Sequence, residues 1–159
     1  GGLQYNSVTS ETFEFMADLL RKGVNVSDIY RKSLKVITKK QFDLRNIANN
    51  RLELLEDGKI AFTYVTKQEQ DELNITTGDH EGIVELGRDI AGVEVSIFLR
   101  EKEENVYKVS FRSNYYVNVS DICLMFNGGG HPRAAGCTMN MTLEQAKERL
   151  IAETKHKLQ

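Results

Sequence analysis

Residues 128–136 read Gly128-Gly129-Gly130-His131-Pro132-Arg133-Ala134-Ala135-Gly136. Three consecutive glycines are costly to order, because glycine loses more backbone freedom on folding than any other residue. They are expected where the backbone takes a positive φ, or where successive main-chain N–H groups form a nest for an anion. The histidine and the arginine add side-chain donors that suit a phosphate group. We therefore predict an anion-binding loop whose ligand contacts come from Gly128, Gly129, Gly130, His131 and Arg133.

A second polar segment, Arg112-Ser113-Asn114, follows a predicted strand. Its side chains offer charged and neutral donors to a phosphate or a base edge. Taken alone, the segment is equally well interpreted as an ordinary polar strand end. Beside the glycine loop, we predict that Arg112, Ser113 and Asn114 form the other side of one binding site.

The chain around these segments alternates between strand-like and helix-like patterns. Asp57-Gly58 lies between two apolar runs and is typical of a β-hairpin turn. Helical spacing of apolar residues recurs at 67–73, 81–90, 118–126 and from 142 onward. The predicted strands are 52–55, 60–65, 93–99, 106–112 and 134–139. The order of elements predicts an α+β fold, with a mixed β-sheet of about five strands flanked by helices.

The N-terminal part is predicted to be entirely helical. Residues 11–21 and 27–34 show helical apolar spacing, and 38–48 reads as a polar, charged helix of the kind that connects two bodies. We therefore predict a helical tail of a preceding domain at 1–34, a helical linker at 35–49 and a C-terminal domain at 50–159.

Composition excludes several classes of protein. The chain has 40% apolar and 28% charged residues and a net charge of -2, the profile of a globular domain without a basic nucleic-acid-binding surface over its whole exterior. It shows no membrane-spanning run and no secretory signal, so we expect a cytoplasmic protein with no membrane partner. Cys123 and Cys137 are interpreted as buried free thiols rather than zinc ligands. His80 is interpreted as part of a helix N-terminus, and no metal site is predicted in this chain.

The segment 128–136 resembles the GGGHxxAAG motif of DHHA1 domains, and Arg112-Ser113 resembles the Arg-Ser motif upstream of it in the same family. The resemblance covers about 50–159. It is closest to the bacterial oligoribonuclease/pAp-phosphatase (nanoRNase) group of DHH/DHHA1 phosphoesterases. Residues 1–5 with Thr9 and Glu11 resemble the tail of the DHH domain that precedes DHHA1.

This resemblance implies an enzyme in which a DHH domain holds two manganese ions and the DHHA1 domain closes over the substrate. It implies that Arg112 and His131 contact substrate phosphate or the nucleotide. The Asp-His-His sequence is absent, so the chain alone is predicted to be inactive, with no catalytic residue of its own. The expected partners are a short RNA or nucleotide substrate and the DHH domain, with a second copy in a homodimer as a further alternative.

Other functions remain open on the same scaffold. The substrate could be a cyclic dinucleotide or, as in RecJ-type exonucleases, single-stranded DNA. The chain could also be a non-catalytic nucleic-acid-binding module, since similar domains occur in alanyl-tRNA synthetase. The helices before residue 35 carry apolar residues that need cover from a neighbouring chain or by folding back: Phe13, Phe15, Met16, Leu19 and Leu20.

Overall fold

The computed structural model describes residues 8–158, which divide into two units at Thr38/Lys39. The predicted DHH-like stretch at residues 1–5 lies outside the described residues. The elements, in chain order, are α1 (Ser10–Arg21), α2 (Val26–Tyr30), η1 (Arg31–Lys35), α3 (Lys39–Asn50), β1 (Glu53–Leu55), β2 (Ile60–Val65), α4 (Lys67–Glu72), η2 (Thr77–His80), α5 (Ile83–Arg88), β3 (Val95–Glu103), β4 (Val106–Ser113), α6 (Val119–Leu124), β5 (Gly129–His131), β6 (Ala134–Asn140) and α7 (Leu143–Leu158).

The smaller unit consists of helices, as the sequence predicts. Helix α1 begins after Thr9, whose side chain forms a capping box with Thr12. Helix α2 is capped by Asn25, which accepts from the Asp28 N–H, and it continues into the π-helical turn η1. None of the residues in these three elements is buried. This unit therefore has no core of its own within the part of the chain that the structure describes.

The larger unit is built on a six-stranded mixed sheet in the order β1-β2-β3-β4-β6-β5. Strands β2 and β3 are parallel, and every other neighbouring pair is antiparallel. The α+β class and the five predicted strands are confirmed. The sixth strand is β5, which lies inside the glycine segment where the sequence predicts only a loop. Helix α3 belongs to this unit and buries Leu44 and Ala48.

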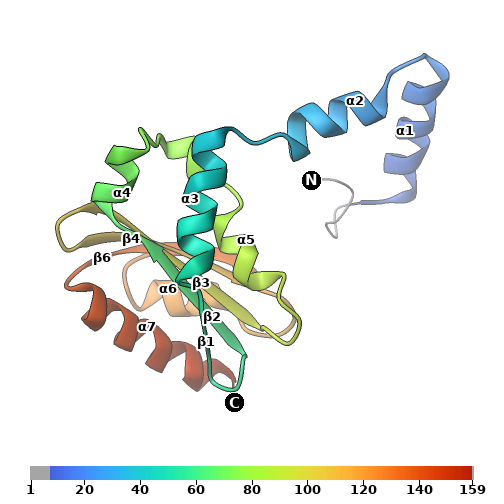
Figure 1. Cartoon of the computed structure of the whole chain (residues 1–159). Helices are drawn as coiled ribbons and strands as arrows, with labels where there is room; N and C mark the ends of the chain where they lie inside the picture. Colours follow the sequence, from blue (N-terminus) through green and yellow to red (C-terminus); the bar gives the residue numbers. More distant parts are fainter. Residues whose placement is uncertain (1–7, 159) are drawn as a thin grey trace. The chain divides into compact units, whose positions relative to one another are not determined.

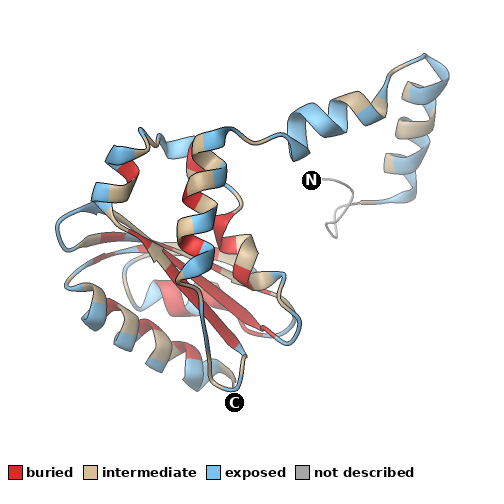
Figure 2. Cartoon of the chain, in the orientation of Figure 1, coloured by how far each residue is buried: buried red, intermediate tan, exposed pale blue. Residues whose placement is uncertain are grey.

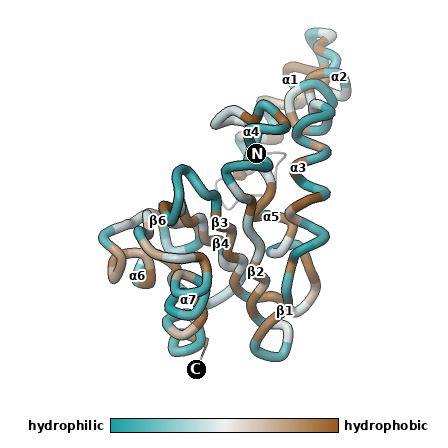
Figure 3. The backbone as a smooth tube through the Cα atoms, turned by 60° about the vertical axis from the view of Figure 1, so that its left-hand side comes forward, coloured by the Kyte–Doolittle hydropathy of each residue, from teal (hydrophilic) through white to brown (hydrophobic). Residues whose placement is uncertain are grey.

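Helices cover the two faces of the sheet unequally. One face, with Ile97 and Phe111, packs on α6 and α7; the opposite face, with Phe98, packs on α3 and α5. Figure 1 and the rotated view in Figure 3 both show α6 and α7 on one side of the strands and α3 and α5 on the other. The buried residues follow the central strands and the inner faces of these helices (Figure 2).

On the α3/α5 side, the end of the sheet formed by β4, β6 and β5 stays open. Because side chains alternate along a strand, only every second residue of these three strands points to this side, and the strand register brings those residues together. None of the residues of this set is buried. We call this surface the open half-face; it consists of Lys108, Ser110, Arg112, Gly129, His131, Ala134, Gly136 and Thr138.

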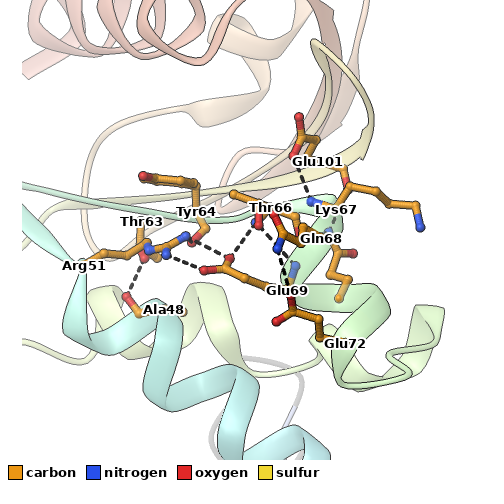
Figure 4. A network of polar contacts seen from close by, with 11 residues as sticks. Ala48, Arg51, Thr63, Tyr64, Thr66, Lys67, Gln68, Glu69, Glu72 and Glu101 are labelled. Atoms are coloured by element: carbon orange, nitrogen blue, oxygen red, sulfur yellow. Dashed lines mark hydrogen bonds and ion pairs between the residues drawn. The ribbon is translucent and has the colours of Figure 1, made fainter.

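At the other end of the same face, a polar network joins α3, β2 and α4 (Figure 4). Arg51 donates two hydrogen bonds to the Glu69 carboxylate, at 3.0 and 2.5 Å, and its guanidinium lies over the Tyr64 ring. Thr63 donates to the Ala48 carbonyl, and Thr66 caps α4 in a capping box with Glu69. These contacts fix α3 and α4 to the β2 side of the sheet, whereas the open half-face belongs to β4, β6 and β5.

Candidate functional site

The glycine segment forms a short hairpin. After α6, the Gly128 N–H donates to the Cys123 carbonyl, and β5 then pairs with β6 from Gly129 opposite Gly136 to His131 opposite Ala134. The two residues between the strands are Pro132 and Arg133. The predicted nest of successive N–H groups is therefore wrong for residues 129–131, because an extended strand points alternate N–H groups in opposite directions.

The three glycines serve different purposes. A Cβ at Gly128 would lie 2.5 Å from the Cys137 Cβ, and one at Gly130 would lie 2.6 Å from the Ala135 Cα. Gly130 also takes a φ of +150°. Gly129 differs from both, because a Cβ there would meet no atom within 4 Å and its φ is not positive. The fold requires Gly128 and Gly130, but it does not require Gly129.

Arg112 and His131 are brought together by strand register. Arg112 on β4 is opposite Ala134 on β6, and Ala134 is opposite His131 on β5. Residues directly opposite on neighbouring strands point to the same side, so both side chains stand on the open half-face with only a methyl group between them. Two strand spacings separate their Cα atoms by about 10 Å. A small anion above Ala134 is within reach of both side chains.

The fold restrains the Arg112 side chain more than the His131 side chain. Arg112 donates from Nε to Glu85 Oε1 at 3.0 Å and from Nη1 to the Phe111 carbonyl at 2.9 Å. These bonds orient the guanidinium, and among residues 8–158 nothing accepts from its Nη2. The exposed His131 has no side-chain hydrogen bond to any described residue. Both groups can therefore donate to a ligand without breaking a contact in the fold.

The structure brings the other predicted residues to the same place, but it gives them partners in the main chain. Ser113 is buried and donates to the Val117 carbonyl at 2.6 Å. Asn114 donates from Nδ2 to the carbonyls of Arg88 and Val93. These residues shape the loop that follows β4. Their predicted contact with a ligand stays a prediction.

Arg133, on the hairpin turn, likewise faces main-chain carbonyls. Its Nη1 donates to the Val117 carbonyl at 2.8 Å and its Nη2 donates to the Tyr115 carbonyl. Its position is beside Arg112 and His131, but its guanidinium holds the loop after β4. Its predicted role as a ligand donor is untested by this geometry.

One residue of the site, Glu94, was not identified from the sequence. It is 2% exposed, and its carboxylate accepts the N–H groups of Tyr115, Tyr116 and Val117 at 2.8–3.2 Å. A buried carboxylate is costly unless hydrogen bonds satisfy it. The available signal was a charged residue between Val93 and Val95 at the start of an apolar strand.

A second basic position lies further along the open half-face. Lys108 is exposed and has no ion pair with any described residue. It is directly opposite Arg100 on β3, so two like charges stand side by side. A shallow depression of about 690 Å³ lies here and is lined by Lys108, Ser110, Gly129, Gly136 and Thr138, among others. Lys108 lies four positions before Arg112 on β4, a distance of about 14 Å.

His80 belongs to a structural cluster. Its ring accepts from Arg100 at 3.1 Å and contacts Gln70 Oε1 at 2.8 Å. Burial lowers the pKa of His80, which favours the neutral ring that this arrangement needs. Within residues 8–158 there is no group of three or more His, Cys, Asp or Glu side chains that could hold a metal ion. The described residues therefore offer no ligand set for the two manganese ions, which the resemblance assigns to the DHH domain.

Two further features bear on the sequence predictions. Cys123 and Cys137 are both buried and free, as predicted. No helix of the described chain is long and apolar enough to cross a membrane.

Comparison with known proteins gives a consistent match. The family model of the DHHA1 domain matches residues 57–159. The bifunctional oligoribonuclease and PAP phosphatase NrnA of Thermus thermophilus is 30% identical over 159 residues, covering 99% of this chain and 47% of that protein. The Bacillus subtilis protein of the same name is 22% identical, over 87% of this chain and 43% of its own length. The chain thus spans about half the length of the curated relatives it matches.

Solved structures agree with this match. An exopolyphosphatase-related protein from Bacteroides fragilis is 30% identical, with a TM-score of 0.87, and the alignment covers 100% of this chain and 48% of that one. A pGpG-specific phosphodiesterase from Vibrio cholerae is 14% identical with a TM-score of 0.60, covering 98% of this chain and 54% of that one. The second likeness concerns the fold alone.

Proposed function

Since the chain belongs to the DHHA1 domain family, we propose that it is the substrate-binding part of a phosphoesterase that hydrolyses short oligoribonucleotides or adenosine 3′,5′-bisphosphate (pAp). The observation that carries this proposal is the pair Arg112 and His131, which stand on one row of the open half-face with only Ala134 between them. The relatives named as oligoribonucleases and PAP phosphatases support the choice of substrate.

The chemistry of this pair fits a phosphate. A guanidinium can donate two parallel hydrogen bonds to phosphate oxygens, and an imidazole N–H can donate a third. Glu85 and the Phe111 carbonyl hold the guanidinium in place before the ligand arrives, which lowers the entropy lost on binding. Gly129, which the fold does not require, lets a ligand approach the strand closely.

The bond-breaking step belongs to another part of the protein in this proposal. A DHH domain would hold the two manganese ions, and the chemistry supplied there would be a metal-activated water for attack on phosphorus. The residues of this chain bind the substrate, orient its phosphate and neutralise part of its charge. The chain by itself should then show no manganese-dependent hydrolysis of a diribonucleotide.

The size of the basic surface favours small substrates. Arg112 and His131 lie at one end of the open half-face, and Lys108 with Arg100 lies about 14 Å away at the other. Proteins that bind long single-stranded nucleic acids use extended basic grooves with many aromatic side chains. We therefore place oligonucleotides of a few residues, rather than long strands, on this surface.

The exposed apolar residues of α1 belong to the same proposal. Phe13, Phe15 and Leu20 are 57%, 64% and 58% exposed. Apolar groups of this size normally lie against protein. We place the DHH domain, or a second copy of the chain, against them.

Equilibrium binding of a fluorescently labelled diribonucleotide to the 159-residue chain tests the function. Arg112→Ala and His131→Ala should each weaken binding by roughly 10- to 150-fold, the range for hydrogen bonds to charged groups. Arg149→Ala is the matched control, because it removes an exposed cation on α7, on the other face of the sheet. Equal affinities of all four proteins would refute the proposed site.

A further inference from the structure

The loop between β4 and α6 has its main chain fixed from two sides. On one side, the buried Glu94 carboxylate accepts the N–H groups of Tyr115, Tyr116 and Val117. On the other side, Arg133 donates to the carbonyls of Tyr115 and Val117. The N–H and carbonyl groups of consecutive residues are thus held by charged side chains, which form stronger hydrogen bonds than neutral ones.

The residues before the loop add to this restraint. Ser113 donates to the Val117 carbonyl, which closes the loop, and Asn114 donates to the carbonyl of Arg88 at the end of α5 and to that of Val93 just before β3. The Asn114 N–H donates to the Glu94 carbonyl at 2.9 Å. Together these bonds leave the backbone of residues 114–117 little freedom to move.

Two consecutive side chains of this restrained loop, Tyr115 and Tyr116, are in solvent. Tyr115 is 78% exposed and Tyr116 is 55% exposed. No described residue makes a hydrogen bond, ring contact or cation–π contact with either side chain. Buried aromatic side chains are among the largest contributors to a core, and neither of these two consecutive rings belongs to the buried core of the described chain. A restrained backbone that presents two free aromatic rings is the arrangement of a binding surface rather than of a core.

These tyrosines lie at the same end of the sheet as the proposed phosphate-binding pair. The loop begins two residues after Arg112, and Arg133, which holds it, is two residues after His131. The Val119 N–H donates to the Pro132 carbonyl at 3.0 Å, and the Ser113 N–H donates to the Arg133 carbonyl at 3.2 Å. The loop and the hairpin turn therefore form one continuous edge of the site.

We propose that Tyr115 and Tyr116 form a stacking surface for a nucleobase of the ligand whose phosphate is bound by Arg112 and His131. The proposal rests on the function proposed above and adds the means by which the base is recognised. Stacking on aromatic rings accepts any base, because every base has a π-face. Tyrosine provides this contact at low entropic cost, since its side chain has only two rotatable bonds.

The absence of tryptophan from the chain allows a direct test. Tyr115→Trp and Tyr116→Trp each introduce a single tryptophan, whose emission can be excited selectively. Addition of pAp should quench the emission of at least one of them, while ribose 3′,5′-bisphosphate, which lacks the base, should not. Tyr64→Trp, on β2 and packed against the core on the α6/α7 face of the same sheet, is the matched control and should not respond to pAp. Absence of pAp quenching in both loop variants would overturn the proposal.

Affinity provides the second measurement. The double variant Tyr115→Ala/Tyr116→Ala should weaken pAp binding by roughly 5- to 150-fold, the equivalent of stacking one base. The double variant Tyr115→Phe/Tyr116→Phe keeps both aromatic rings and should bind pAp as tightly as the parent. Binding of ribose 3′,5′-bisphosphate should be unchanged in the double alanine variant. Equal loss for both ligands would show a structural effect of the loop and overturn the stacking proposal.

The two proposals can fail separately. Arg112→Ala should weaken pAp and ribose 3′,5′-bisphosphate alike. If it does so while the tyrosine variants bind pAp normally, stacking is refuted and the phosphate site stands. If Arg112→Ala changes neither affinity, the proposed function itself fails.

Discussion

Replacing each of the three glycines by alanine, one at a time, separates what the fold needs from what a ligand needs. In Gly130→Ala, the new Cβ would lie 2.6 Å from the Ala135 Cα and 2.5 Å from the Ala134 carbonyl oxygen. Those atoms belong to the backbone of β6, so they cannot rotate away. The φ of +150° adds a second penalty, because L side chains rarely adopt it.

The magnitudes follow from these two terms. Strain at such a φ costs about 1–3 kcal/mol, and overpacking against a fixed neighbour costs about 1–3 kcal/mol more. Gly130→Ala should therefore lower the free energy of unfolding by about 2–6 kcal/mol, a large part of the stability of an ordinary domain. Gly128→Ala has the steric term alone and should lose about 1–3 kcal/mol. Gly129→Ala meets open space and should be neutral or stabilise by up to about 1 kcal/mol.

Urea unfolding followed by circular dichroism measures the three values on the same chain. The affinity for pAp, measured on the folded variants, is then compared with their stability. Gly129→Ala should keep full stability yet weaken binding, because its methyl group narrows the approach to the strand. A Gly129→Ala variant as unstable as Gly130→Ala, or a Gly130→Ala variant as stable as the parent, would refute this account of the hairpin.

Three further predictions follow from single contacts. Glu94→Gln should lower the free energy of unfolding by about 1–3 kcal/mol, because the bonds to residues 115–117 lose their charge; an unchanged urea midpoint would contradict this. Lys108→Ala should reduce the slope of log affinity against log salt by about 0.7 for a triribonucleotide, and an unchanged slope would remove Lys108 from the surface. Burial would raise the pKa of Asp79, but hydrogen bonds from Lys40 and Thr76 outweigh it and lower that pKa from 3.8 to about 2. The ionised carboxylate is thus favoured in the folded state, so its stabilisation is present above about pH 4 and is lost as the pH falls toward 2. Asp79→Asn should flatten that part of the stability–pH curve, and an unaltered curve would contradict the assignment.

The elements with strong local signals were predictable from the sequence. Asp57-Gly58 gives the β1–β2 hairpin because its residues accept positive φ, and Asp57 at +53° and Gly58 at +80° adopt it. The apolar runs that form β3 and β4 and the capping residues of α6 and α7 are also signals contained in a few neighbouring residues. Strand β5 was missed because glycine has low strand propensity. Its pairing comes from β6, which the tight turn at Pro132-Arg133 places alongside it.

For the candidate site, the sequence indicates which residues to consider but not how they are arranged. Arg112 and His131 were identified by their residue types and by the family motif. Their place on one row depends on the register of three strands, which no local pattern sets. The partners of Glu94 lie more than twenty residues away along the chain. Such contacts form only when the sheet is assembled, so a sequence can mark Glu94 as unusual without naming what it binds.

A crystal of the chain soaked with pAp tests the central claim most directly. We expect a phosphate group above Ala134, within hydrogen-bond distance of the Arg112 guanidinium and the His131 imidazole. A phosphate bound elsewhere, such as on the α6/α7 face, or no bound pAp at a concentration well above the measured dissociation constant, would contradict it.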